Sequence, residues 1–154
     1  MPNERQLGAR PAAAFLFGAL CLIACPSARL SAQEVSYQNL VQPVFAGSKT
    51  VVGEDIAYPP GRSPKVTSVI VTVPPGGQTG WHIHPVPLFG YILEGELVVD
   101  YGDKGKRTYR QGDGFLEAMG TPHNGTNSGT APVRILAVYM GADGVPNAVA
   151  KPHP

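Results

Sequence analysis

Short runs of β-branched and aromatic residues, separated by turn residues, dominate this chain after position 33. The clearest run covers 66–73, and a longer one over 89–100 is interrupted by a glycine. Glycine-rich turns bracket a strand over 106–110, and further strands are expected over 115–118 and 133–140. No run has the period of a long amphipathic helix. The pattern therefore predicts an all-β protein, a single-domain antiparallel β-barrel or jelly roll.

Three other stretches are less clearly patterned. Segments 40–45 and 49–52 can each form an edge strand, although a proline limits the first. The tail after position 141 is rich in proline, and we expect it to run extended over the surface. The sequence contains neither an internal repeat nor a linker, so residues 33–154 are expected to form one domain.

The first 32 residues have the features of a secretory signal peptide. Two arginines precede an apolar run over 12–25, which is shorter than the roughly 20 residues that cross a bilayer comfortably. Cleavage after Ala32 leaves Gln33 first. Alternatively, the residues before Cys25 resemble a bacterial lipobox, which predicts a lipid anchor on that cysteine. Both alternatives predict an exported protein, either periplasmic or secreted, with no membrane-spanning helix.

The composition excludes two classes of function. Both cysteines, Cys21 and Cys25, lie in the leader, so a chain cut after Ala32 has no thiol for catalysis or metal binding. The formal net charge is +1, and the basic run at 104–107 is too small to form a nucleic-acid surface. We therefore expect no nucleic-acid partner and no thiol chemistry.

Three histidines are spaced so that they can meet at one point. His82 and His84 alternate, so on a strand they lie on the same face, about 6 to 7 Å apart. His123 follows a later predicted strand. Imidazole nitrogens bind divalent transition ions at about 2.0 to 2.1 Å, so the three form a candidate metal site. His153 lies in the tail and is not expected to be a ligand.

The spacing of these residues resembles the two motifs of the cupin family, G-x5-H-x-H-x3-4-E-x6-G and G-x5-P-x-G-x2-H-x3-N. The matching positions of this chain are Gly76, His82, His84, Gly95, Gly112, Gly120, His123 and Asn127. Ala118 stands where the second motif has proline. The resemblance covers residues 66–140 and implies a small β-barrel with one metal ion on the three histidines. Asn127 is expected to fix its strand through bonds from its side chain to the backbone.

The glutamate that completes the metal site in the family falls at position 88, where this chain has Leu88. Three alternatives follow. The metal can be held by three histidines alone, with open positions for water or substrate. Glu117, which shares a strand face with Phe115, can act as a ligand or as a general acid or base. The histidines can also be polar groups that bind no metal. Nitrogen ligands suit iron, manganese, zinc and nickel alike.

The resemblance implies an enzyme that acts on a small organic molecule inside the barrel. A dioxygenase-type oxidoreductase is the first hypothesis, with a non-redox lyase or isomerase on the same metal, or a binding protein without catalysis, as alternatives. The substrate pocket is expected to be lined by Trp81, Leu88, Phe89, Tyr91 and Phe115. Since cupins commonly dimerise, a homodimer is expected.

Overall fold

The computed structural model describes residues 36–154, and the predicted leader lies outside this range. All the strands of the described residues lie in the compact unit Leu40–Pro154. Within residues 36–154, no helix has the length and apolar character that crossing a membrane requires. Two short 3-10 turns, Tyr37–Leu40 and Gly102–Lys104, are the helical elements of this range.

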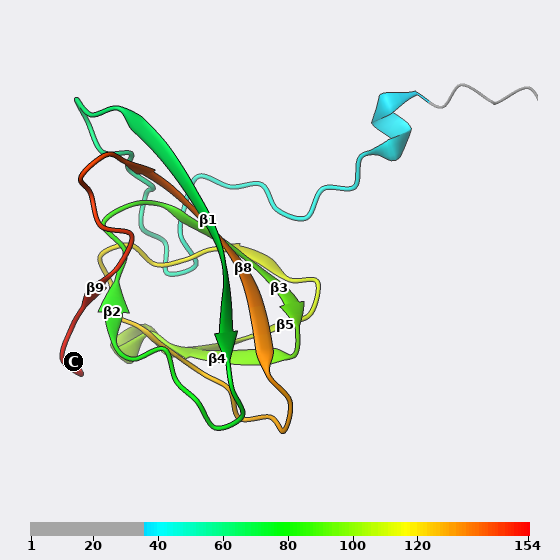
Figure 1. Ribbon diagram of the computed structural model, residues 1–154, viewed down its shortest axis with the longest axis vertical. Coiled ribbons are helices and arrows are strands. Elements are labelled where there is room, and N and C mark those ends of the chain that lie inside the picture. The colour runs from blue at the N-terminus through cyan, green and yellow to red at the C-terminus, as the bar shows by residue number, and fades with distance from the viewer. Residues whose placement is uncertain (1–35) are drawn as a thin grey trace, which may run out of the picture. The chain divides into compact units, whose positions relative to one another are not determined.

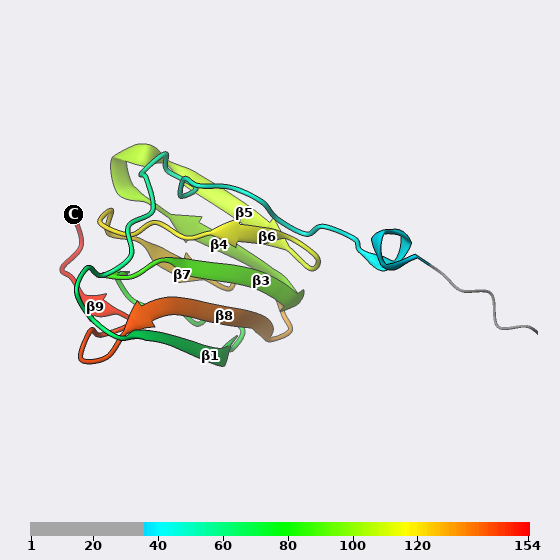
Figure 2. The same cartoon turned by 90° about the horizontal axis from the view of Figure 1, so that it is seen from above.

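Antiparallel sheets build the unit Leu40–Pro154 (Figure 1). The larger sheet has the order β1-β8-β3-β6, made of strands Pro64–Val73, Val133–Ala142, Leu88–Glu94 and Gly114–Leu116. Figure 2 shows β1, β8 and β3 of this sheet side by side. The smaller sheet has the order β5-β4-β7, made of Lys106–Arg110, Glu96–Asp100 and Asn124–Thr126. A third pair joins β2, His82–Ile83, to β9, Val149–Ala150. The predicted fold class, all-β and antiparallel, is confirmed.

The expected strands form where alternation and turn residues agree. The predicted strand over 106–110 coincides with β5, and the run over 89–100 is divided into β3 and β4 at Gly95. This glycine has a φ of 81°, and a Cβ placed on it would lie 3.1 Å from the carbonyl oxygen of Pro132. Because both the dihedral angle and the space disfavour a side chain, glycine is required at this turn.

The two expected edge strands before position 60 are not formed. Segment 40–45 has no regular structure, and 49–52 begins a tight turn rather than a strand. The Thr50 carbonyl accepts a bond from the Gly53 amide at 2.9 Å, and a single bridge pairs Lys49 with Asp55. The expectation was wrong because apolar residues at 51 and 52 pack against the core from a turn, without strand pairing.

The core lies between the larger and smaller sheets. Its fully buried members include Ile92 of β3, Val99 of β4 and Val133 of β8. Each such aliphatic side chain contributes roughly 1.5 to 3 kcal/mol by leaving water. The core also contains Phe115 and Tyr101, and the ring centroid of Tyr101 lies 5.7 Å from that of His123.

Asn127 has the structural role that was expected of it. Its side-chain amide donates to the carbonyl oxygens of Val73, at 2.9 Å, and Ala131, at 2.8 Å. Its Oδ1 accepts a bond from the Gly129 amide at 2.9 Å. The residue is buried, so these bonds join the end of β1 to the loop before β8 without exposure to water.

Candidate metal centre

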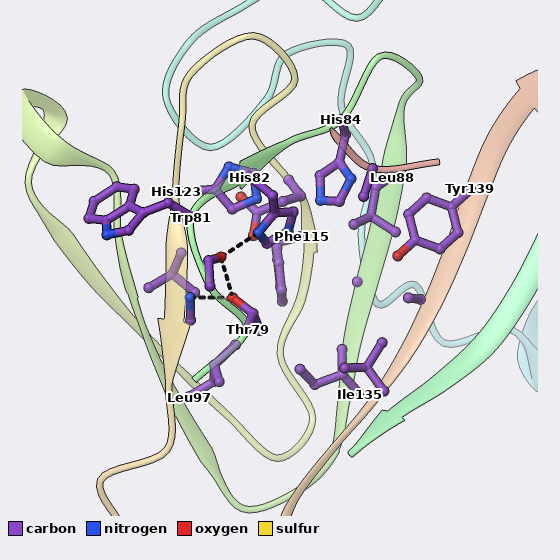
Figure 3. A pocket seen from close by; sticks show the side chains of 18 of the residues that line it. Thr79, Trp81, His82, His84, Leu88, Leu97, Phe115, His123, Ile135 and Tyr139 are labelled. Atoms are coloured by element: carbon purple, nitrogen blue, oxygen red, sulfur yellow. Dashed lines mark hydrogen bonds between the residues drawn. The ribbon is translucent and has the colours of Figure 1, made fainter. Parts of the chain in front are cut away.

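His82, His84 and His123 converge at one end of a cavity (Figure 3). One nitrogen of each ring belongs to a group whose members all lie within 4.8 Å of one another. The ring centroid of His123 lies 4.4 Å from that of His82 and 5.1 Å from that of His84. Two backbone bonds of 3.0 Å pair His82 with His123, and the His84 amide donates to the Met119 carbonyl at 2.9 Å. Backbone pairing thus brings together residues that are far apart in the sequence.

The outer nitrogen of each imidazole is fixed by a backbone carbonyl. The Nδ1 atoms of His82, His84 and His123 lie 2.7, 2.8 and 2.9 Å from the carbonyl oxygens of Gly80, Asn147 and Thr121, respectively. Because a carbonyl oxygen can only accept, each Nδ1 carries the proton and each neutral ring keeps its lone pair on Nε2. A carbonyl on the outer nitrogen is the usual arrangement for metal-binding histidines.

The Nε2 atoms of the three histidines have the protonation state that a metal ligand needs. His123 Nε2 is buried and has no hydrogen-bond partner, and leaving such an atom unpaired is costly. Burial lowers the pKa of His84 to about 3 and holds the pKa values of His82 and His123 below their ordinary value of 6.5. The three rings are therefore neutral at physiological pH, which fits a divalent ion.

The cavity beside the histidines has a volume of about 420 Å³ and a mostly apolar wall. The histidines lie at one end, and Leu97 and Ile135 lie at the other (Figure 3). Besides the histidines, its ionisable residues are Glu117 and Tyr139, and the described wall contains neither lysine nor arginine. A cavity of this size holds a small organic molecule, and its wall favours an uncharged one.

Three of the five expected pocket residues line this cavity, namely Trp81, Leu88 and Phe115. Phe89 and Tyr91 do not, because successive side chains of β3 point to opposite faces of the sheet. Leu88 and Gly90 face inward, whereas the Phe89 ring packs on the outer face with its centroid 6.1 Å from that of Phe45. Leu88 lies beside His84 in Figure 3, where it extends the apolar wall up to the metal centre.

Glu117 is buried in the same cavity but is not in the group of converging nitrogens. Burial raises its pKa to about 7, although bonds from the Ala118 amide, at 2.7 Å, and the Tyr101 hydroxyl act in the opposite direction. The hydroxyls of Tyr101 and Tyr109 lie 2.9 Å apart, and burial raises the pKa of both phenols. The carboxyl group is therefore poised to exchange a proton near neutral pH.

The C-terminal tail forms part of the site instead of running over the surface as expected. Ala148 and Ala150 line the cavity, and Asn147 supplies the carbonyl that fixes the His84 ring. The Lys151 amide donates to the Trp81 carbonyl at 2.9 Å. The sequence pattern missed this arrangement because β9 has only two residues, too few for an alternation to be visible.

Tyr139 and Thr79 are further residues of the site that sequence reasoning missed. Tyr139 is the third member of an inward-facing series on β8, after Ile135 and Ala137, so strict alternation along the strand could have found it. The Thr79 hydroxyl donates to the Gly80 carbonyl at 3.2 Å, the same oxygen that fixes His82. No sequence pattern indicates that Thr79 shares the carbonyl oxygen that fixes His82.

Comparison with known proteins bears directly on this site. Residues 69–139 match the family model of the cupin domain. Similar solved structures include oxalate decarboxylase of Bacillus subtilis, with 27% identity over 55% of this chain and 23% of that one, at a TM-score of 0.46. DMSP lyase DddQ from Ruegeria pomeroyi DSS-3 has 24% identity over 56% of this chain and 43% of that one, at a TM-score of 0.49. The oxalate decarboxylase of Lactobacillus farciminis has 23% identity over 55% and 26%, at a TM-score of 0.47.

The match spans less than half of each of these three structures. No curated protein matches the chain. The region that matches the family model carries His82, His84 and His123 together with most of both sheets. Residues 69–139 therefore match the cupin domain, the family whose two motifs the histidine spacing resembles.

Proposed function

We propose that this chain is an enzyme that binds one divalent transition ion on His82, His84 and His123 and acts on a small organic molecule. The observation that carries the proposal is the set of three Nε2 atoms, each freed for an ion because its ring donates a bond from Nδ1 to a carbonyl. Iron, manganese, zinc and nickel all accept such nitrogen ligands.

The proposed substrate is uncharged, largely apolar and able to offer one oxygen to the ion. The wall described above lacks a cation that could pair with a carboxylate, and leucine at position 88 removes a further polar group. An ion on three nitrogens supplies Lewis acidity to that oxygen and leaves coordination positions open. The apolar wall excludes water and strengthens the polar contacts near the histidines.

Glu117 is proposed as the general acid or base of the reaction. Glu117 lines the cavity, and its raised pKa allows it both to hold and to release a proton at neutral pH. The Tyr101 hydroxyl acts on the pKa of this carboxyl group in the direction opposite to burial, so that the pKa stays near neutral. Because Glu117 stands outside the converging group, we propose proton transfer in preference to metal ligation.

The proposed reaction is that of a dioxygenase, in which dioxygen is the oxidant and both of its atoms enter the organic product. Enols and phenols, such as 1,3-diketones and flavonols, fit an apolar cavity with one polar end. A lyase or isomerase reaction is the second candidate, because Glu117 can move a proton next to a carbonyl without any oxidant.

Oxygen uptake by protein reconstituted with Fe(II) tests the reaction type. With a panel of diketones and flavonols, wild type and the outward-facing control Phe89→Ala are expected to consume one O2 per substrate, whereas His82→Ala consumes none. Product that forms without oxygen and is lost in Glu117→Gln supports the lyase or isomerase. Tight binding of these compounds with no turnover under either condition contradicts an enzyme and supports a binding protein.

We also propose that the protein is exported from the cytoplasm. Expression in a bacterium, followed by N-terminal sequencing, is expected to yield a chain that begins at Gln33, or a lipid-modified one that begins at Cys25. A chain that retains its first residues in the cytoplasm contradicts export.

A second copy of the chain is the proposed partner of β1. This ten-residue strand is one of the two edge strands of the larger sheet, and its side chains Val66 and Ile70 are 69% and 46% exposed. An apolar edge of this length favours strand pairing. Light scattering is expected to give the mass of a dimer, and Ile70→Lys that of a monomer. A monomeric wild type contradicts this part of the proposal.

A further inference from the structure

Glu54 lies in a tight hairpin that precedes the first strand. The Thr50 amide donates to the Glu54 carbonyl at 2.8 Å, and the Thr50 hydroxyl accepts a bond from the Glu54 amide at 3.1 Å. The Val51 amide donates to the Leu116 carbonyl of β6 at 2.9 Å, which attaches the hairpin to the larger sheet. The Glu54 carboxylate is therefore held in place by its own backbone.

This carboxylate accepts five hydrogen bonds. The amides of Met119, Gly120 and Thr121 donate to it at 2.7, 3.1 and 2.9 Å. The hydroxyls of Thr121 and Thr50 donate at 2.8 and 3.1 Å. Three successive backbone amides aimed at one carboxylate form an anion-binding turn within the chain itself.

The loop that Glu54 holds touches two of the three histidines from outside the cavity. Its Met119 carbonyl accepts the bond from the His84 amide, and its Thr121 carbonyl accepts the bond from His123 Nδ1. The Met119 carbonyl fixes the backbone of His84, and the Thr121 carbonyl fixes the tautomer of the His123 ring. If the loop moves, both Nε2 atoms move with it.

We propose that Glu54 is a positioning residue for the metal centre, which orders the loop over 119–121 so that His84 and His123 present their Nε2 atoms to one ion. The role rests on the proposed metal site and goes beyond it, because this carboxylate stands neither in a cupin motif nor in the cavity wall. Without the carboxylate, three amides lose their acceptor, and the loop no longer has one preferred arrangement.

Titration with Co(II), followed by its visible absorption, tests the role of Glu54. In Glu54→Gln, the side-chain NH2 faces amide donors, and we expect Co(II) affinity to fall about 10- to 100-fold with an altered spectrum. Glu54→Asp keeps the charge and is expected to recover part of the affinity. The matched control is Asp55→Asn, which removes an adjacent exposed acid that pairs with Lys49 and is expected to bind as wild type does.

The possible results separate this role from the metal site itself. If wild type binds Co(II) and Glu54→Gln binds it with the same affinity and spectrum, the role of Glu54 is refuted while the metal site stands. If wild type binds no Co(II), the proposed function fails and this role fails with it. If Glu54→Gln does not fold, Thr121→Val, which removes one of the five bonds, is measured instead. Its expected loss is about threefold to tenfold, and an unchanged affinity overturns the proposal.

Discussion

Replacing Glu117 with glutamine tests whether this carboxyl group is buried as a proton carrier. Glutamine keeps the size of a protonated glutamic acid and one oxygen that can accept from the Ala118 amide. It cannot titrate. The variant therefore removes the pH dependence that Glu117 gives to the metal-free protein and leaves the packing of the cavity nearly unchanged.

The expected magnitude follows from the pKa. Glu117 has a pKa of about 7 in the folded protein and an ordinary value of 4.5 when exposed. Between these values the unfolded chain releases the proton while the folded chain holds it, so the free energy of unfolding falls as pH rises. At about 1.4 kcal/mol per tenfold change in the dissociation constant, the full loss is about 3 kcal/mol. The lowered pKa values of His84 and His123 act in the opposite direction and are common to both proteins. The pKa of His82 is set by burial, the Gly80 carbonyl, His123 and, least of all, the charge of Glu117, so it alone also responds to the substitution.

Urea denaturation of wild type and Glu117→Gln, with a chelator present, measures this difference. Between about pH 4 and pH 8, the stability of wild type relative to the variant is expected to fall by about 3 kcal/mol. A bound divalent ion favours the ionised form of Glu117 and is expected to make the pH-dependent difference in stability between wild type and Glu117→Gln smaller. A difference between the two proteins that stays constant across this range refutes the raised pKa and, with it, the proton-transfer role of Glu117.

Three further predictions concern the wall of the cavity and its tail. Leu88→Glu restores the carboxylate of the family motif and is expected to raise metal affinity at least about tenfold in a Co(II) titration. An unchanged affinity would show that position 88 cannot reach the ion. Deleting residues 147–154 removes the acceptor of His84 Nδ1 and two wall residues, so metal affinity is expected to fall about 10- to 100-fold by the same titration. Leu97→Trp fills the far end of the cavity and is expected to abolish uptake of a flavonol while metal content by elemental analysis stays the same. Loss of metal in this variant would contradict the idea that the metal site at one end of the cavity is independent of the packing at the other end.

The sequence was sufficient to predict those parts of the molecule in which local signals repeat. Strand β5 has clear turn residues on both sides, and Gly95 separates two strands because only glycine tolerates its backbone angle. The three histidines could be found because His82 and His84 alternate across the end of β2 and His123 follows a spaced motif. In each case the local pattern and the tertiary arrangement agree.

The remaining parts depend on contacts that leave no local pattern. Glu54 reaches a loop 65 to 67 positions later in the chain through a hairpin with no strand period. The tail contributes Asn147 through a backbone oxygen, and any residue type provides such an atom. Phe89 and Tyr91 are expected in the pocket from the sequence because they lie near the histidines along the chain. Strand alternation, however, directs both side chains to the face of the sheet opposite to Leu88.

Elemental analysis of the tag-free protein tests the three-histidine centre most directly. Wild type, His123→Ala and the control His153→Ala are each incubated with iron, manganese, zinc and nickel in turn and freed of unbound metal. His153 lies in the tail outside the converging group, so its variant separates site-specific binding from general binding by histidine. The account predicts close to one equivalent of at least one ion in wild type and His153→Ala, and less than about 0.2 equivalents in His123→Ala. Less than about 0.2 equivalents of every ion in wild type, or equal content in wild type and His123→Ala, would contradict it.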